Sequence, residues 1–107
     1  MNTIFVQAGD NIDYTPSADV PAGAVIVQGD LVGVTKRPIA ANTQGSLAVS
    51  GVFDFPKAAV AIAVGVNVYW SATASQATAT ATGNKIIGKT IRAAAAADAT
   101  VRVRLSQ

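Results

Sequence analysis

Apolar residues in this chain recur at every second position far more often than at every third or fourth. A period of two places alternate side chains on one face of a strand, and the apolar positions are rich in valine and isoleucine, which favour strands. The pattern therefore predicts an all-β protein. Its predicted strands are all short: Ile4–Gln7, Ala24–Gln28, Leu31–Lys36, Ser46–Phe53, Ala59–Val64, Asn67–Ser71, Lys85–Ile91 and Thr100–Leu105.

Residues that favour tight reversals separate these predicted strands. Glycine, proline and asparagine supply the turns, which we place at Pro21–Gly23, Gln28–Asp30, Asn42–Gly45, Gly65–Asn67 and Thr82–Asn84. About eight short strands with frequent turns are typical of a small β-barrel or β-sandwich. The 107 residues suffice for one compact domain. We expect residues 20–107 to form it, and residues 1–19 to form an extended N-terminal arm or a first strand followed by a loop.

Two segments of small residues leave alternatives open. The five alanines Ala93–Ala97 favour a helix by propensity, but so short a helix is marginal, which leaves a loop or one helical turn. Alanine and threonine alternate over Ala77–Thr82, so a strand here would place Thr78, Thr80 and Thr82 on one face. Such a strand is either an exposed hairpin arm or a flat surface that another protein can approach closely.

The composition argues against several classes of function. The chain contains no histidine, cysteine or glutamate, so histidine-based catalysis, thiolate metal sites and most acid–base pairs are unavailable. We therefore expect no enzymatic activity, no metal, no cofactor and no small-molecule substrate. The net charge is only +2 without a basic stripe, which argues against nucleic-acid binding. The N-terminus lacks the features of a signal peptide, and the longest apolar run is far shorter than the roughly 20 residues of a membrane span.

One catalytic motif matches formally. Residues Gly83–Thr90 fit G-x-x-x-x-G-K-[ST], the phosphate-binding loop of nucleotide triphosphatases. That loop needs a buried strand before it and a helix after it, but Ala-Thr repeats precede this segment and Ile86 and Ile87 favour extended backbone. Too few residues follow for the rest of such a fold. The segment is predicted to be a turn plus a strand, with a nucleotide-binding, recombinase-like protein as an alternative that Lys89→Ala would test.

An ordered set of short motifs resembles the capsid cement, or decoration, proteins of tailed bacteriophages. The motifs extend from about Gly9 to Leu105, and the strongest part is Gly51–Lys57 together with Tyr69-Trp70. The set comprises Val20-Pro21-Ala22-Gly23, Gly33-Val34, Gly51-Val52-Phe53-Asp54, Pro56-Lys57, Gly65, Val68-Tyr69-Trp70, Ile87-Gly88 and Val101-Arg102-Val103-Arg104-Leu105. The formal phosphate-loop match is a further point of similarity to that family.

This resemblance implies a tulip-like β-barrel on the outer surface of the icosahedral head of the virion. Such a protein is commonly a homotrimer that clamps neighbouring subunits of the major capsid protein, and it is made in the cytoplasm of the bacterial host. The alternative is another small β structural module of a phage particle, such as a tail component, or an adhesin. Selective binding to head shells would distinguish these two hypotheses.

Candidate partner-binding residues follow from the same features. The arm Asn2–Tyr14 is a candidate capsid or neighbour contact, and Arg102 and Arg104 share one face of the last strand, where they are either solvated or bound to an acidic partner. Tyr69 and Trp70 point to opposite sides of their strand, so that one fills the core while the other packs on a neighbour. The full candidate set is Asn2, Ile4, Phe5, Tyr14, Lys36, Arg37, Trp70, Thr78, Thr80, Arg102 and Arg104.

Overall fold

The computed structural model describes residue 3 and residues 9–106, and this part of the chain contains strands and no helix. The all-β prediction is confirmed. The strands are β1 (Asn11–Tyr14), β2 (Val25–Gln28), β3 (Leu31–Thr35), β4 (Gly45–Ala48), β5 (Gly51–Pro56), β6 (Asn67–Ser71), β7 (Gln76–Thr78), β8 (Lys85–Thr90) and β9 (Thr100–Leu105). The described residues include no helix long and apolar enough to cross a bilayer.

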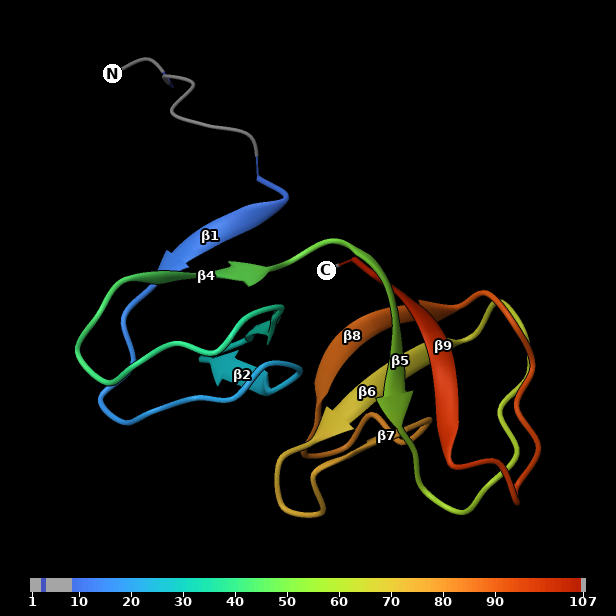
Figure 1. The fold of residues 1–107 in the computed structure, drawn as a ribbon. Coiled ribbons are helices and arrows are strands. Elements are labelled where there is room, and N and C mark those ends of the chain that lie inside the picture. The colour runs from blue at the N-terminus through green and yellow to red at the C-terminus, as the bar shows by residue number, and fades with distance from the viewer. Residues whose placement is uncertain (1–2, 4–8, 107) are drawn as a thin grey trace.

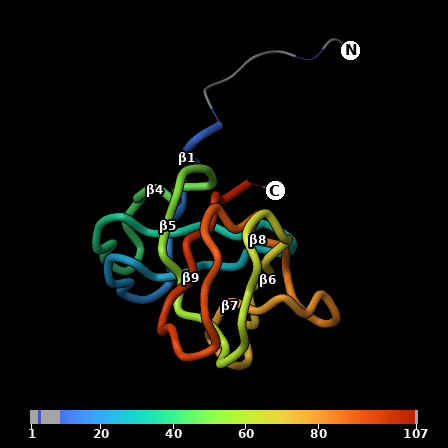
Figure 2. The backbone as a smooth tube through the Cα atoms, turned by 90° about the vertical axis from the view of Figure 1, so that its right-hand side faces the viewer, coloured from blue at the N-terminus to red at the C-terminus, as the bar shows by residue number. Residues whose placement is uncertain are grey.

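The strands form two antiparallel sheets (Figure 1). The first sheet has the order β1-β4-β3-β2, and the second has the order β5-β9-β8-β6-β7. An isolated parallel bridge between Lys57 and Ala77 brings the end of β5 to β7, but the sheets are not closed into a barrel. The sandwich is therefore the alternative that fits. In Figure 2 the loop between β7 and β8, coloured orange, extends away from the rest of the molecule.

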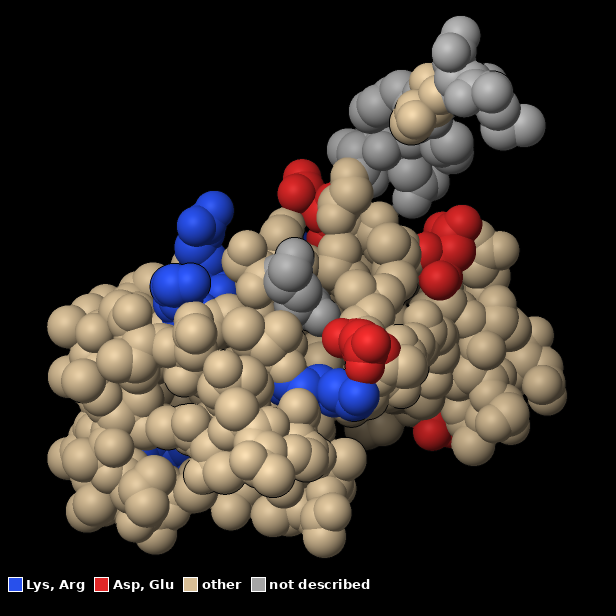
Figure 3. Space-filling model, turned by 180° about the vertical axis from the view of Figure 1, so that it is seen from behind, with Lys and Arg blue, Asp and Glu red and all other residues tan. Residues whose placement is uncertain are grey.

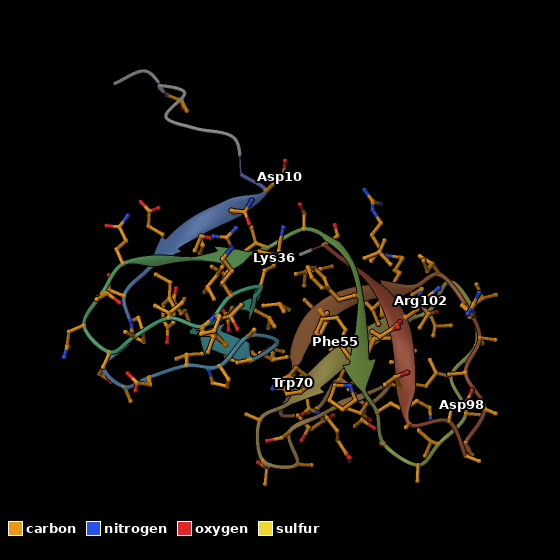
Figure 4. All side chains as sticks on the ribbon, viewed as in Figure 1. Asp10, Lys36, Phe55, Trp70, Asp98 and Arg102 are labelled. Atoms are coloured by element: carbon orange, nitrogen blue, oxygen red, sulfur yellow. The ribbon has the colours of Figure 1, made fainter. Side chains whose placement is uncertain are left out.

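The main hydrophobic core lies inside the curved second sheet. Alternate residues of β5, β6, β8 and β9 point inward, as the period of two requires, and include Phe55 and Trp70, whose ring centroids are 6.2 Å apart (Figure 4). The first sheet joins this core through Val34 of β3 and the partly buried Val25 and Val27 of β2. Burial of these valines is what holds the two sheets together as one sandwich.

Several predicted strand boundaries are wrong for identifiable reasons. The predicted strand Ser46–Phe53 is two strands, because the chain bends after β4 and Gly51 adopts a φ of +117°. The predicted strand Ala59–Val64 is a loop in which only Ile62 forms a bridge, to Ala94. The strand predicted from Ala77 ends at Thr78, so Thr80 and Thr82 lie in the following loop.

Other segments agree with the sequence. The Ala93–Ala97 run is a loop, the first of the two alternatives. Gly23, Gly65 and Gly83 adopt φ values of 79°, 75° and 76° in predicted turns, where a left-handed backbone favours glycine. The predicted strand Ile4–Gln7 lies outside the described residues, and β1 was not predicted.

The segment Gly83–Thr90 is a turn followed by β8, as predicted. The extended backbone of β8 spreads its N–H groups along the strand, where they pair with β6 and β9. A phosphate-binding loop instead directs successive N–H groups to one point at the start of a helix. The formal motif therefore lacks the conformation on which its chemistry depends.

Candidate functional site

The outer face of the second sheet combines exposed apolar residues with cations. Directly paired residues of an antiparallel sheet share a face, and Arg104 of β9 pairs with both Val52 of β5 and Lys89 of β8. Arg102, two residues before Arg104, lies on the same face, and its carbonyl oxygen accepts a hydrogen bond from the N–H of Ile91. We call Val52, Lys89, Ile91, Arg102 and Arg104 the basic face.

Two properties make the basic face a candidate docking surface. Val52 and Ile91 are 51% and 46% exposed, which leaves apolar area open to solvent on a sheet whose other side is the core. Lys89 and Arg104 are both exposed and lie directly opposite each other on neighbouring strands. Neither forms an ion pair with an acid among the described residues. Adjacent like charges repel, so an acidic partner would be attracted to both.

Arg102 differs because it has a partner in its own chain. Its Nε donates a hydrogen bond of 3.0 Å to Asp54 on β5, and its Nη2 donates one of 3.2 Å to the second carboxylate oxygen. The hydrogen bond from the guanidinium lowers the pKa of Asp54 and raises the pKa of Arg102. Arg102 therefore already has a countercharge in its own chain, and the unpaired charges of the basic face are those of Lys89 and Arg104.

Charge is divided unequally between the two sheets. Residues 1–50 contain two basic and four acidic residues, whereas residues 51–107 contain six basic and two acidic residues. These counts give −2 for the first part and +4 for the second, which together make the net +2 of the chain. On the face that Figure 3 shows, cations lie on the left and in the middle of the molecule, and acids lie from the middle to the right. The second sheet is thus the part with the stronger attraction for an acidic surface.

Two grooves lie beside the strand ends. The larger, which we call the first groove, has a volume of about 760 Å³ and includes Lys36 and Arg37. Its lining residues are Asn11, Lys36, Arg37, Pro38, Ile39, Ala40, Thr43, Gln44, Gly45 and Ser46. The second groove has a volume of about 240 Å³ and is lined by Asp54, Arg92, Ala93, Ala94, Asp98, Ala99, Thr100, Val101 and Arg102.

The structure separates the predicted candidate residues into different environments. Lys36 and Arg37 line the first groove, and Arg102 and Arg104 lie on the opposite half of the molecule, on β9 (Figure 4 labels Lys36 and Arg102). Tyr14 and Thr78 are half-buried at the ends of β1 and β7, and Thr80 is exposed. Asn2, Ile4 and Phe5 lie outside the described residues.

Trp70 belongs to the core. It is only 7% exposed and packs on Phe55, so its ring is not presented to a partner, whereas Tyr69 on the other side of β6 is half-buried. The predicted set in turn lacks Val52, Lys89 and Ile91. Strand alternation indicates that these three residues face outward. Lys89 and Ile91 flank the buried Thr90, and Val52 precedes the inward-facing Phe53.

The described residues offer no group of three or more metal-ligating acids. What the surface offers instead is contact area, cations and hydrogen-bonding groups, which suits association with another protein.

Comparison with known proteins gives the family. A family model described as phage cement protein matches residues 6–105, nearly the whole chain. Searches of curated proteins and of solved structures each gave no match. Cement proteins are structural components associated with the phage capsid. Since the family model covers nearly all of it, this chain belongs to the phage cement protein family.

Proposed function

We propose that this protein binds the outer surface of the expanded phage head and clamps neighbouring major capsid subunits. The observation that carries the proposal is the basic face, in which the unpaired Lys89 and Arg104 lie between the exposed Val52 and Ile91. An acidic, partly apolar patch on the coat protein would complement this surface in both charge and polarity.

Cementing requires no chemistry beyond such contacts. Each docking surface on a single copy is small, but a shell presents many equivalent sites, and contacts that bridge two coat subunits resist their separation. From the family resemblance we further infer a homotrimer on the capsid. Residues 11–14 form β1 of the first sheet, so we retain only the segment before β1 as a candidate arm that contacts the coat or a neighbouring copy.

The test is co-sedimentation of the purified protein with expanded, undecorated head shells of the phage that encodes it, with unexpanded shells as the comparison. Saturable binding selective for expanded shells is the expected result, and it should weaken as salt is raised because exposed charges are screened. Absence of binding to either shell would overturn the proposal and favour a tail component or an adhesin.

A pair of variants assigns the surface. Lys89→Gln with Arg104→Gln removes the two unpaired charges of the basic face, and we expect binding to weaken by at least about tenfold. The matched control, Lys85→Gln with Arg92→Gln, removes the same total charge from cations that lie near acids of their own chain: Lys85 Nζ is 2.6 Å from Asp30, and Arg92 shares the second groove with Asp54. Equal weakening by both pairs would exclude the basic face as the specific contact.

A further inference from the structure

The two sheets are built to one plan. The order of the first sheet, β1-β4-β3-β2, matches the order β5-β9-β8-β6 in the second when strands are taken in chain order and β7 is set aside. Each half thus contains a strand, a loop, a two-stranded antiparallel unit and a returning strand that inserts between the first strand and that unit. β7 and the loop after it are an addition to the second half.

Hydrogen bonds repeat at corresponding positions. Val20 and Ile39 form an isolated bridge with two bonds of 2.9 and 2.8 Å, and Ile62 and Ala94 form the same bridge with the same two distances. Three residues after the first member of each bridge stands a glycine with positive φ, Gly23 or Gly65. Its N–H donates to the carbonyl oxygen of a threonine at the end of the third strand.

Those two threonines, Thr35 and Thr90, are buried and do the same work in each half. The Thr35 hydroxyl donates to the carbonyl oxygen of Pro21 at 2.7 Å and accepts from the N–H of Ala24 at 2.9 Å. The Thr90 hydroxyl donates to the carbonyl oxygen of Ala63 at 2.6 Å and accepts from the N–H of Val66 at 3.2 Å. Each hydroxyl therefore ties the glycine turn of its half to the adjacent strand.

The sequence correspondence follows from these contacts. From β1 to β2 the equivalent residues are 42 positions apart, as Val20 and Ile62 show, and from β3 to β4 they are 55 apart, as Thr35 and Thr90 show. The difference is the insertion that contains β7. Identical residues at equivalent positions include the pairs Gly23/Gly65, Gly33/Gly88, Thr35/Thr90 and Arg37/Arg92. A side chain at Gly33 or at Gly88 would press on the neighbouring returning strand, at Leu47 and Ala48 or at Arg104.

The two grooves are equivalent under this correspondence. Shifting residues 37–40 and 43–46 of the first groove by 55 positions gives 92–95 and 98–101, and all of these except residue 95 line the second groove. Arg37 and Arg92 therefore occupy the same place in the two halves. The same groove is therefore present in both halves, larger in the first half than in the second.

The charges of the two grooves differ. The second groove is lined by Asp54, Asp98, Arg92 and Arg102. The hydrogen bond from Arg102 lowers the pKa of Asp54, and the charge of Arg92 adds to this effect. In the first half, Ile12 stands at the position of Asp54 and Thr43 at the position of Asp98. The first groove has no acidic lining residue, and Lys36 and Arg37 form no ion pair within the described part of the chain. Asp13, which pairs in register with Ser46, is not among its lining residues.

We propose that the first groove binds a carboxylate-bearing segment of the major capsid protein, which supplies to Lys36 and Arg37 the kind of countercharge that Asp54 supplies to Arg102 inside the second groove. The inference rests on the proposed function and extends it, because the first groove and the basic face lie on different halves of the chain. A protein that clamps neighbouring subunits needs two such separate contacts.

The experiment compares three forms of the full chain on expanded shells: the wild type, Lys36→Gln with Arg37→Gln, and the control Lys85→Gln with Arg92→Gln. Both pairs replace exposed or partly exposed cations, and thermal melts first establish that each form is folded. We expect at least about tenfold weaker binding for the groove pair and at most about twofold for the control. Unchanged binding of the groove pair, or equal weakening by both pairs, would overturn the groove assignment while leaving the proposed function intact.

A second measurement is independent of shells. Titration with hexaglutamate, followed by NMR of the backbone amides, should shift the signals of Arg37, Thr43 and Gly45 in the wild type, and hexalysine should not. If the wild type fails to bind shells but shows these shifts, the proposed function and the capsid protein as partner both fail, and only the affinity of the first groove for carboxylates stands. Absence of hexaglutamate shifts at the first groove would overturn the inference.

Discussion

Lys89 on β8 lies directly opposite Arg104 on β9, so two cations stand side by side on the outer face of the second sheet. Paired like charges destabilise a sheet by up to about 1 kcal/mol. Replacing Arg104 by Gln should therefore raise the free energy of unfolding slightly while it weakens binding to expanded shells. Denaturant unfolding and co-sedimentation measure the two effects. Loss of stability, or unchanged shell binding, would contradict the role assigned to this pair.

Trp70 is a core residue, and we predict that the surrounding side chains cannot fill the space left when its ring is removed. Trp70→Ala removes the ring that packs on Phe55 and leaves a cavity inside the second sheet, which should lower the free energy of unfolding by about 3–5 kcal/mol. Chemical denaturation measures this change, and Ile91→Ala at the exposed surface serves as the control. A denaturation curve like that of the wild type would refute burial of Trp70.

The equivalence of the two halves predicts parallel effects at their threonines. Thr35→Val and Thr90→Val each keep the side-chain shape but leave a carbonyl oxygen and an N–H without their partner. Each should cost about 1–3 kcal/mol of stability, whereas Thr80→Val in an exposed loop should be nearly neutral. Equilibrium unfolding of the three variants provides the comparison. A large cost at one threonine and none at the other would contradict their equivalence.

The ion pair of Asp54 with Arg102 predicts a small loss of stability in acid. The pKa of Asp54 is lowered from its ordinary value of 3.8, so the unfolded chain binds more protons as the pH falls toward that value. The stabilisation is complete above the unfolded pKa and is lost as the pH drops through the folded one. The pair is exposed to solvent, which screens the two charges, so its contribution to stability is small.

Asp54→Asn should accordingly reduce the fall in Tm between about pH 6 and about pH 3. The hydrogen bond from Lys85 likewise lowers the pKa of Asp30, at an exposed site. This second ion pair remains in Asp54→Asn, so the variant tests the Asp54 pair alone. An unaltered pH dependence in Asp54→Asn would mean that the pair does not contribute in solution.

The strands that the sequence predicts well are those with strong alternation and clear turns. Thr100–Leu105 and Asn67–Ser71 have the predicted bounds, since valines or aromatic residues alternate there with polar ones. The predicted strand Ala59–Val64 is wrong because a continuous apolar run of small residues fits a strand and a packed loop equally well. Its conformation is decided by the bridge from Ile62 to Ala94, a contact between distant segments.

The candidate site was predicted only in part. Arg102 and Arg104 were placed on one face by alternation, but whether each is free depends on the neighbouring strand, which brings Asp54 to Arg102 and Lys89 to Arg104. Strand pairing is not readable from one strand alone. The internal repeat was also hidden, because the insertion with β7 breaks the register and few residues are identical.

If this protein holds coat subunits together, a decorated shell should resist heat better than a bare one. Expanded shells would be heated with and without a saturating amount of the protein, and rupture would be followed by light scattering and electron microscopy. Decorated shells should rupture at a higher temperature than bare ones, with the gain reduced for Lys89→Gln with Arg104→Gln. Rupture at the same temperature despite full occupancy would contradict the cementing role.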